Sequence, residues 1–504
     1  MDPTTTAAVS DHRSRRVHVL VFPYPAQGHM LPLLDLTHQL ALRNVAITVL
    51  VTPKNLPILS PLLSRHPSIN TLVLPFPASP AIPAGVENAK DLPASGFRVL
   101  MVALGGLQGQ IVDWFRRHPS PPTAILSDIF VGFTHRLAAE VGVPRYTFSP
   151  SGTAAMSVIF TLWREMPKRK NPNDQNEIFR FPEVPNSPEF PWWQLSPVYR
   201  SYVEGDPSSE FIRQMYFDNT VSYGLLFNSF SAAEGVYLDY MRKYLGNERI
   251  WSVGPLLPPD VPAERGGSAA VSAADILSWL DSAESNSVVY VCFGSQAVLT
   301  DPQMEALAAG LEKSGVNFLW STKGPTKGHV DGERYGTIPP GFQQRVGPRG
   351  LVIQGWVPQM LILNHPAVAA FLTHCGWNST LESLTAGVPL LTWPMGADQY
   401  ANANLLVDEH RVAVRACQGE KAVPDSDELA GLLSKAVKEK GAEIRANALR
   451  LRTAAMAAIK DGGDSFNNLD NFVKHLYEDA SEIPKVSSNS PMLSAPVPAF
   501  GALV

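Results

Sequence analysis

Short runs of apolar residues recur along the first half of the chain, and their lengths suit buried strands. The first two, residues 17–22 and 45–51, flank a segment in which apolar residues repeat at helical spacing from Met30 to Leu42. These connections are too long for hairpins, so the strand–helix–strand order predicts a parallel βαβ unit. Further strands are predicted at residues 71–74, 124–126, 146–148 and 225–227. The first half is therefore expected to form a doubly wound α/β domain.

The second half repeats this pattern after a break in composition. Residues 254–270 are rich in Pro, Gly and Ala and have the character of a linker. Beyond them, helices are predicted at 276–280 and 302–313, and strands at 287–293, 317–320, 351–353, 369–373 and 390–393. We divide the chain into a disordered tail (1–16), a first domain (17–255), a linker (256–275), a second domain (276–460), a C-terminal helix (461–482) and a second disordered tail (483–504). Two α/β domains joined in this way predict a ligand cleft between them.

Residues 165–210 interrupt the first domain with a segment rich in Pro, Asn, Arg, Lys and Trp that has little periodicity. The sequence Pro191-Trp192-Trp193 is unusual for a loop. The segment either covers part of a cleft or packs on the surface around its own tryptophans, and the sequence favours neither interpretation.

Composition and charge exclude several classes of function. The chain has 504 residues, a net charge of −5 and three scattered cysteines. Nucleic acid and anionic membranes are therefore not expected as partners, and neither a disulfide framework nor a zinc site is predicted. The N-terminus lacks the apolar core of a signal peptide, and no run approaches the roughly 20 apolar residues of a membrane span. We expect a monomer in the cytoplasm.

Residues 356–399 combine a predicted strand, a glycine turn and a helix start with polar side chains at the turn. An apolar strand ending at Thr373 leads through a glycine turn into a helical pattern, an arrangement that directs backbone N–H groups at an anion. His374, Asn378 and Ser379 can add donors, and Glu382 can accept two adjacent hydroxyls such as those of a ribose. The spacing of Ser379 and Glu382 also fits a capping box, which would explain both residues without any ligand.

This stretch resembles the signature segment of the plant family 1 UDP-glycosyltransferases, the secondary-product glycosyltransferases of GT-B fold. The matching residues are Trp356, Gln359, His374, Gly376, Trp377, Asn378, Ser379, Glu382, Asp398 and Gln399. The resemblance extends over residues 17–475. Residues 18–22, 51–55 and 73–77 are similar to those of a subgroup that acts on flavonols. The family resemblance implies two Rossmann-like doubly wound domains that face each other across a cleft, with a C-terminal helix crossing back to the first domain.

The resemblance also implies roles for individual residues. His29 matches the family's catalytic histidine, although a lone histidine beside a helix start is more often a solvated or capping residue. Asp128 matches the aspartate that bonds this histidine, although it could equally be a turn or N-cap residue. The UDP-sugar would be bound by Ser295, Ser321, Trp356, Val357, Gln359, His374, Gly376, Trp377, Asn378, Ser379, Glu382, Asp398 and Gln399. Tyr24, Phe130, Phe148 and Trp393 are predicted to line the acceptor site.

The expected reaction is inverting transfer of glucose from UDP-glucose to a hydroxyl of a plant phenolic such as a flavonoid. Imidazole, with an unperturbed pKa of about 6.5, suits a general base. Gln399 matches a family position typical of glucosyltransferases. No metal or other cofactor is implied, and Asp425-Ser-Asp427, which resembles a metal-binding D-x-D pattern, is interpreted as a helix start. The alternatives are C-glucosylation of an aromatic carbon, a non-catalytic UDP-sugar-binding protein and an epimerase-like enzyme, the last without support from the sequence.

Overall fold

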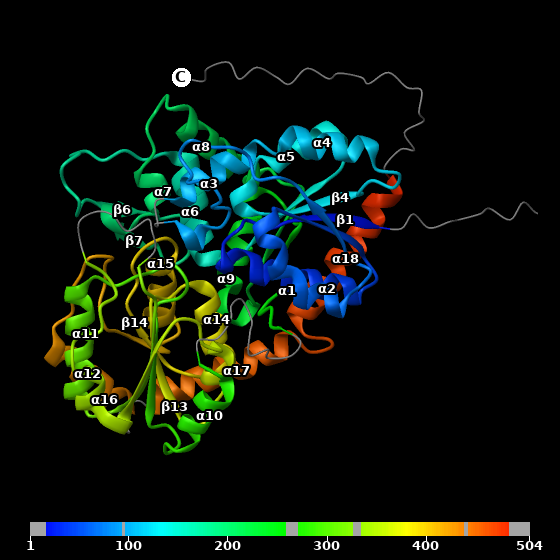
Figure 1. Cartoon of the computed structure of the whole chain (residues 1–504). Helices are drawn as coiled ribbons and strands as arrows, with labels where there is room; N and C mark the ends of the chain where they lie inside the picture. The colour runs from blue at the N-terminus through cyan, green and yellow to red at the C-terminus, as the bar shows by residue number, and fades with distance from the viewer. Residues whose placement is uncertain (1–16, 93–95, 259–270, 326–333, 438–441, 483–504) are drawn as a thin grey trace, which may run out of the picture.

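The computed structural model describes residues 17–92, 96–258, 271–325, 334–437 and 442–482. Two lobes, each built on a parallel sheet, lie against one another (Figure 1). Both predicted tails and most of the predicted linker lie outside the described residues. The final part of that linker is helical, since α10 (Ala273–Asp281) begins after Ser272, whose side chain caps it.

The first sheet has seven strands in the order β3-β2-β1-β4-β5-β8-β9. Its strands are β1 (His18–Phe22), β2 (Ala46–Val51), β3 (Asn70–Val73), β4 (Ala124–Asp128), β5 (Arg145–Ser149), β8 (Gly224–Phe227) and β9 (Ile250–Ser252). All neighbours pair in parallel, as the βαβ pattern predicts. The order reverses between β1 and β4, so the carboxyl ends of these two strands flank the position where doubly wound sheets bind ligands.

The second sheet has six parallel strands in the order β12-β11-β10-β13-β14-β15. They are β10 (Val288–Cys292), β11 (Asn317–Thr322), β12 (Gly350–Gln354), β13 (Val368–Thr373), β14 (Leu390–Thr392) and β15 (Ala413–Arg415). The three-residue edge strands β9 and β15 were not predicted.

Helices cover both sheets on both faces. In the first lobe they are α1 (Gln27–Leu42), α2 (Ser60–Arg65), α3 (Gly96–Gly105), α4 (Gln108–Arg117), α5 (Thr134–Val141), α6 (Thr153–Glu165), α7 (Pro197–Arg200), α8 (Pro207–Thr220) and α9 (Ser231–Leu245). In the second they are α10, α11 (Asp301–Ser314), α12 (Phe342–Val346), α13 (Gln359–Leu363), α14 (Trp377–Ala386), α15 (Gln399–Asn404) and α16 (Ser426–Val437).

The chain returns to the first lobe through α17 (Ala442–Ala458) and α18 (Asp464–Glu482), as Figure 1 shows. Helix α17 packs on both α14 and α9, and α18 packs on β9. The apolar face of α18, including Phe472, joins the core on one side of the first sheet. Its Asp479 accepts hydrogen bonds from the hydroxyls of Tyr146 and Tyr223. The C-terminal helix thus belongs to the packing of the first lobe.

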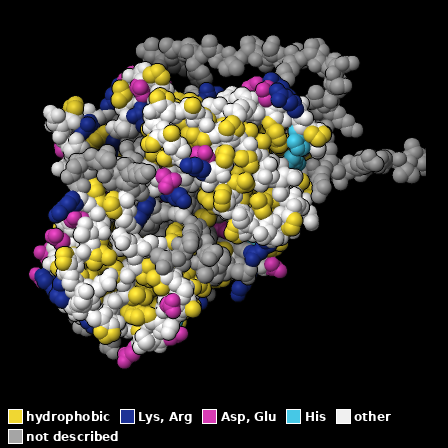
Figure 2. Space-filling view, viewed as in Figure 1, with side chains coloured by type: hydrophobic (Ala, Val, Ile, Leu, Met, Phe, Trp, Pro, Cys, Tyr) yellow, Lys and Arg dark blue, Asp and Glu magenta, His cyan; other side chains and the backbone are white. Residues whose placement is uncertain are grey.

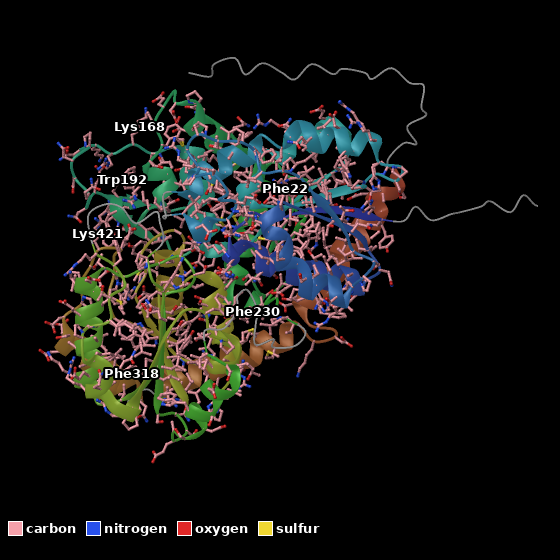
Figure 3. All side chains as sticks on the ribbon, in the orientation of Figure 1. Phe22, Lys168, Trp192, Phe230, Phe318 and Lys421 are labelled. Atoms are coloured by element: carbon pink, nitrogen blue, oxygen red, sulfur yellow. The ribbon has the colours of Figure 1, made fainter. Side chains whose placement is uncertain are left out.

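Residues 165–210 contain a hairpin of β6 (Ile178–Arg180) and β7 (Glu189–Pro191). Trp192 packs on Phe179 with ring centroids 5.5 Å apart, and Trp193 packs edge-on against Tyr400 of the second lobe at 5.4 Å. Figure 3 labels Trp192 on the first-lobe side of this junction and Lys421 on the other. The segment therefore has a small aromatic core of its own and also contacts the second lobe.

The face shown in Figure 2 carries interspersed acidic and basic side chains and no broad field of one sign. No helix in the described ranges has the length and hydrophobicity needed to cross a membrane.

Candidate active site

His29 and Asp128 lie together at the carboxyl edge of the first sheet, although 99 residues separate them in the sequence. His29 is in the first turn of α1, and Asp128 is the last residue of the neighbouring strand β4. The imidazole Nδ1 lies 3.1 Å from Oδ1 and 3.0 Å from Oδ2 of the carboxylate. An ionised carboxylate only accepts hydrogen bonds, so Nδ1 must carry a proton and donate it. The other ring nitrogen, Nε2, is then left unprotonated and available as a base in the neutral imidazole.

Asp128 also caps the short helix that follows it. Its Oδ1 accepts a hydrogen bond of 2.8 Å from the backbone N–H of Phe130. The carboxylate is fully buried, whereas the His29 side chain remains 15% exposed. Asp128 is therefore both a cap and a partner of the histidine. The backbone N–H of Phe130 fixes one carboxylate oxygen, and His29 is held by both oxygens.

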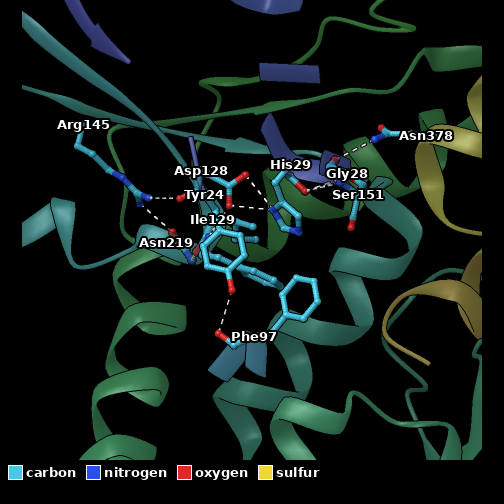
Figure 4. A network of polar contacts seen from close by, with 12 residues as sticks. Tyr24, Gly28, His29, Phe97, Asp128, Ile129, Arg145, Ser151, Asn219 and Asn378 are labelled. Carbon is cyan, nitrogen blue, oxygen red and sulfur yellow. Dashed lines mark hydrogen bonds and ion pairs between the residues drawn. The ribbon is translucent and has the colours of Figure 1, made fainter. Parts of the chain in front are cut away.

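Aromatic side chains pack against the imidazole (Figure 4). Ring centroids of Phe130, Tyr24 and Phe97 lie 4.5, 5.2 and 6.3 Å from that of His29. The Tyr24 hydroxyl donates to the Phe97 carbonyl at 2.9 Å, and burial beside Asp128 raises the pKa of Tyr24 well above its usual value. Tyr24 is fully buried behind the half-buried Phe130. Phe97, the second residue of α3, was not identified from the sequence, because no local pattern links it to His29.

Three of the four predicted acceptor residues are wrong, because Tyr24, described above, Phe148 and Trp393 are all fully buried. Phe148 lies on β5 in the middle of the sheet and is fully buried in the core beneath α1 and α18. Trp393 is also fully buried, packed edge-on against Phe293 at 5.2 Å, with its indole N–H donating to the Gly419 carbonyl. Strands of a parallel sheet that is covered on both faces send apolar side chains into one core or the other, not into the cleft.

A small pocket opens between the lobes beside α6. Its apolar side is formed by Ala155, Val158, Ile159 and Leu162 of α6 together with Phe190 and Leu195 of the 165–210 segment. Asp398 and Tyr400 line it from the second lobe. Helix α6 was not singled out in the sequence, because its mostly buried, apolar surface resembles that of any core helix. The pocket has the concave, largely apolar character of a small-molecule site.

The turn between β13 and α14 is crowded around His374. An added Cβ on Gly294 would lie 2.7 Å from the imidazole, and one on Gly376 would lie 2.6 Å from its Nε2. Gly294 also has a φ of +75°, which only glycine adopts easily. Burial lowers the pKa of His374 to about 4, so its ring is neutral near pH 7. A neutral imidazole beside the start of α14 can donate one hydrogen bond to an anion there.

Gln359, Ser379 and Glu382 form a connected group on the same side of the cleft. The Gln359 amide nitrogen donates to Ser379 Oγ at 3.0 Å and to Glu382 Oε2 at 2.8 Å. Its oxygen accepts from the buried Tyr290 hydroxyl at 3.1 Å. Ser379 is the third residue of α14, whose N-cap is Gly376, so the capping-box interpretation is wrong. The structure thus presents Glu382 as a carboxylate oriented by an amide.

The remaining predicted donor-site residues differ in what they can offer a ligand. Trp356 is half-buried and its indole N–H has no partner among the described residues, whereas Ser321 Oγ donates to the Gly355 carbonyl at 3.1 Å. The side chain of Val357 is buried in the core, so only its backbone could reach a ligand. Ser295, on the loop after β10, accepts a hydrogen bond of 2.7 Å at its carbonyl from Lys323.

Trp377 and Asn378 join the two lobes. The indole N–H of Trp377 donates to the Asn228 carbonyl at 2.7 Å, and the Asn378 amide donates to the Gly28 carbonyl at 2.9 Å (Figure 4). The Trp377 side chain is buried, so its predicted contact with a UDP-sugar could come only from its backbone. Because Gly28 precedes His29, the Asn378 bond places the start of α14 beside the histidine.

Asp398 and Gln399 face this point from the start of α15. Gln399 Oε1 accepts from the backbone N–H groups of Met395 and Gly396 at 2.9 and 3.0 Å, so only its amide nitrogen can serve a ligand. Burial raises the pKa of the Asp398 carboxyl, while hydrogen bonds from Ser151 and Asn402 act in the opposite direction. Ser151 was missed because it lies in a short turn before α6 that carries no recognisable pattern.

Asp425 caps α16, as predicted. Its Oδ1 accepts from the backbone N–H groups of Asp427 and Glu428, both at 2.9 Å. These bonds lower the pKa of Asp425. Within the described ranges, no three His, Cys, Asp or Glu side chains are grouped closely enough to hold a metal ion.

Comparisons with known proteins identify a family and relatives for this chain. Residues 267–452 match the family model described as UDP-glucoronosyl and UDP-glucosyl transferase. The chain is 56% identical to UDP-glycosyltransferase 89B2 of Stevia rebaudiana, over 91% of this chain and 97% of the relative. It is 54% identical to the flavonol 3-O-glucosyltransferase UGT89B1 of Arabidopsis thaliana, over 92% and 97%. The crystal structure of Arabidopsis thaliana UGT89C1 complexed with UDP-L-rhamnose matches with a TM-score of 0.76 and 39% identity, covering 92% of this chain and 99% of that one.

Proposed function

Because the chain belongs to the UDP-glucoronosyl and UDP-glucosyl transferase family and has the GT-B fold of its solved plant relatives, we propose that it transfers glucose from UDP-glucose to a hydroxyl of a phenolic acceptor such as a flavonoid, with inversion at the anomeric carbon. The observation that carries this proposal is the His29–Asp128 pair, which is exposed to the cleft on its histidine side only. The alternative of a UDP-sugar-binding protein without activity is set aside, because the close relatives are glycosyltransferases.

In the proposed reaction, His29 Nε2 accepts the proton of the acceptor hydroxyl as its oxygen attacks the anomeric carbon of the sugar. The bond between that carbon and the diphosphate oxygen breaks, and UDP leaves with the electron pair. The proton on Nε2 makes the ring an imidazolium, which the Asp128 carboxylate stabilises from the opposite side. Phe130, Tyr24 and Phe97 keep water from the imidazole.

The charge on the departing UDP would be met by the start of α14, with donors from His374, Asn378, Ser379 and Ser295. Asn378 uses one of its two amide N–H donors on Gly28, so the other remains for the ligand. Glu382 would accept the ribose hydroxyls, and Trp356 would stack on the uracil. We propose that neither a metal nor another cofactor takes part.

Glucose is proposed as the sugar because its hydroxyls can donate to the Asp398 carboxylate and accept from the Gln399 amide nitrogen. A sugar with a misplaced hydroxyl would leave one of these groups unpaired, at about 1–3 kcal/mol. The relatives include a named glucosyltransferase and a protein solved with UDP-L-rhamnose, so the choice has to be measured. A panel of UDP-sugars tests it, and a preference for UDP-galactose, UDP-glucuronate or UDP-rhamnose over UDP-glucose would refute it.

The acceptor and the bond formed can be tested together. UDP release is measured with and without a flavonol. The mass of the product is then determined by mass spectrometry, and its stability in hot acid is tested. An O-glucoside is hydrolysed, whereas a C-glucoside, the second candidate product, survives. Acceptor-independent UDP release as fast as turnover would refute the transferase proposal for this substrate class. We also propose that the protein acts as a cytoplasmic monomer, which light scattering and cell fractionation would check.

A further inference from the structure

A buried arginine lies directly behind the His29–Asp128 pair. Arg145 is the first residue of β5, and its side chain is only 2% exposed. Its Nε donates to Ser127 Oγ at 2.9 Å, and one terminal nitrogen, Nη1, donates to Asn219 Oδ1 at 2.8 Å and to Ser222 Oγ at 2.7 Å. The other, Nη2, donates to the backbone carbonyl of Asp128 at 3.4 Å (Figure 4). All of these acceptors are uncharged oxygens.

This network fixes the corner of the chain that carries Asp128. Asn219, which accepts from Arg145, donates in turn to the carbonyl of Ile129 at 2.8 Å. The carbonyls of two successive residues, Asp128 and Ile129, are therefore both held from the side away from His29. With the Phe130 N–H bonded to the carboxylate, the backbone on each side of Asp128 is constrained. The orientation of the carboxylate toward Nδ1 depends on this corner.

Two carboxylates act on the charge of Arg145, first Asp218 and then Asp128. Asp218 also pairs with Arg136, whose Nε lies 3.2 Å from Oδ2. The bond that Arg145 donates to Asp128 goes to its backbone carbonyl and not to its carboxylate. Arg145 is therefore a buried positive charge that lies behind the Asp128–His29 pair without forming a salt bridge to it.

We propose that Arg145 is a positioning residue for the transfer reaction, which holds the Asp128 corner in place and keeps a buried positive charge behind the Asp128–His29 pair. This inference rests on the proposed role of His29 and Asp128 as base and partner. The titratable groups that act on Asp128 are His29 from α1, Tyr24 from the turn before it and Tyr216 from α8. Arg145 adds a buried positive charge to this set.

The test separates the charge of Arg145 from its hydrogen bonds. Arg145→Met removes the charge and the hydrogen bonds. Arg145→Lys keeps the charge but loses the several hydrogen bonds that the planar guanidinium makes. Removing a positive charge lets the Asp128–His29 pair bind a proton more readily, so the acid limb of the kcat profile should move to higher pH by roughly 1 unit in Arg145→Met. In Arg145→Lys the limb should stay in place while kcat falls about tenfold through poorer orientation. The KM for UDP-glucose should change less than twofold in both, because the donor is bound by the other lobe.

A matched control is Arg242→Met. Arg242 also ties elements of the first lobe together, donating to the Ile250 carbonyl at 3.0 Å, but it has no contact with the Asp128 corner. Its pH profile should be that of the unaltered protein. If Arg145→Met does not fold, Asn219→Leu, which removes one bond to Arg145 and the bond to Ile129, should lower kcat at least threefold with an unshifted limb.

Three outcomes decide the matter. An acid limb that does not move in a folded Arg145→Met protein overturns the role of the charge. Unchanged kcat in both Arg145→Lys and Asn219→Leu overturns the role of the corner. If His29→Ala and Asp128→Asn themselves retain full kcat, the proposed base fails and the inference falls with it, which distinguishes the two failures.

Discussion

Replacing Asp128 by asparagine should change which nitrogen of His29 carries the proton. Oδ1 of Asp128 is held by the Phe130 N–H at 2.8 Å, so the amide oxygen of asparagine would take that position. The amide nitrogen would then occupy the place of Oδ2, 3.0 Å from His29 Nδ1. The amide oxygen would remain about 3.1 Å from Nδ1, but the amide N–H groups at the Oδ2 position would compete for Nδ1 as an acceptor, and the tautomer that they favour carries its proton on Nε2. In that tautomer the nitrogen that faces the cleft is not a base.

The expected loss in kcat is large. A wrong tautomer in an analogous Asp–His pair costs up to about 10⁴-fold, and loss of a general base costs about 10²–10⁴-fold. We therefore expect both His29→Ala and Asp128→Asn to lower kcat by about 10²–10⁴-fold. The double variant should be no more than a fewfold worse than His29→Ala, because an orienting group without its base has no effect.

The assay is initial-rate UDP release with a flavonol at saturating UDP-glucose. The matched control is Asp470→Asn on α18, whose carboxylate is 49% exposed and pairs with Arg43 far from the cleft. It should retain full kcat. Losses that multiply in the double variant would mean that the two residues act independently. A raised acceptor KM with unchanged kcat in His29→Ala would refute its role as the base.

Three further predictions concern the second lobe. Treatment with a chelator should leave turnover unchanged, and activity that is lost with EDTA and restored by Mg²⁺ or Mn²⁺ would contradict the metal-free mechanism. Gly294→Ala should raise the KM for UDP-glucose at least tenfold, since the new Cβ would lie 2.7 Å from His374 and the residue has a φ of +75°. An unchanged KM in initial-rate kinetics, with an unchanged Kd in titration calorimetry, would show that this loop does not hold the donor. The folded-state pKa of His374, about 4, lies below its unfolded value, so the unfolded chain binds more protons and stability should fall as pH drops from about 6.5 to 4. In His374→Gln the midpoint of urea unfolding should depend less on pH across that window. An equally steep pH dependence would mean that other groups cause it.

Local sequence patterns were sufficient for the architecture. The apolar runs and the leucine spacing after Met30 depend only on neighbouring residues, so the parallel α/β units could be predicted from them. The donor-side residues from His374 to Glu382 lie on one turn and one helix, and their proximity follows from the sequence alone. The same is true of Asp425, whose cap on α16 needs no tertiary contact.

Tertiary structure decided what faces the cleft. Phe148 lies in β5 and Trp393 directly follows β14, each in a sheet covered on both faces, and a strand pattern cannot tell which aromatic side chain ends in a core. Ser151 and the apolar side of α6 reach the cleft only because the second lobe packs beside them. The bond between His29 and Asp128 forms because β1 and β4 are adjacent in the sheet, a pairing that brings together residues 99 positions apart. Long-range strand order has no local signature, and it is this order that places Arg145 behind the pair.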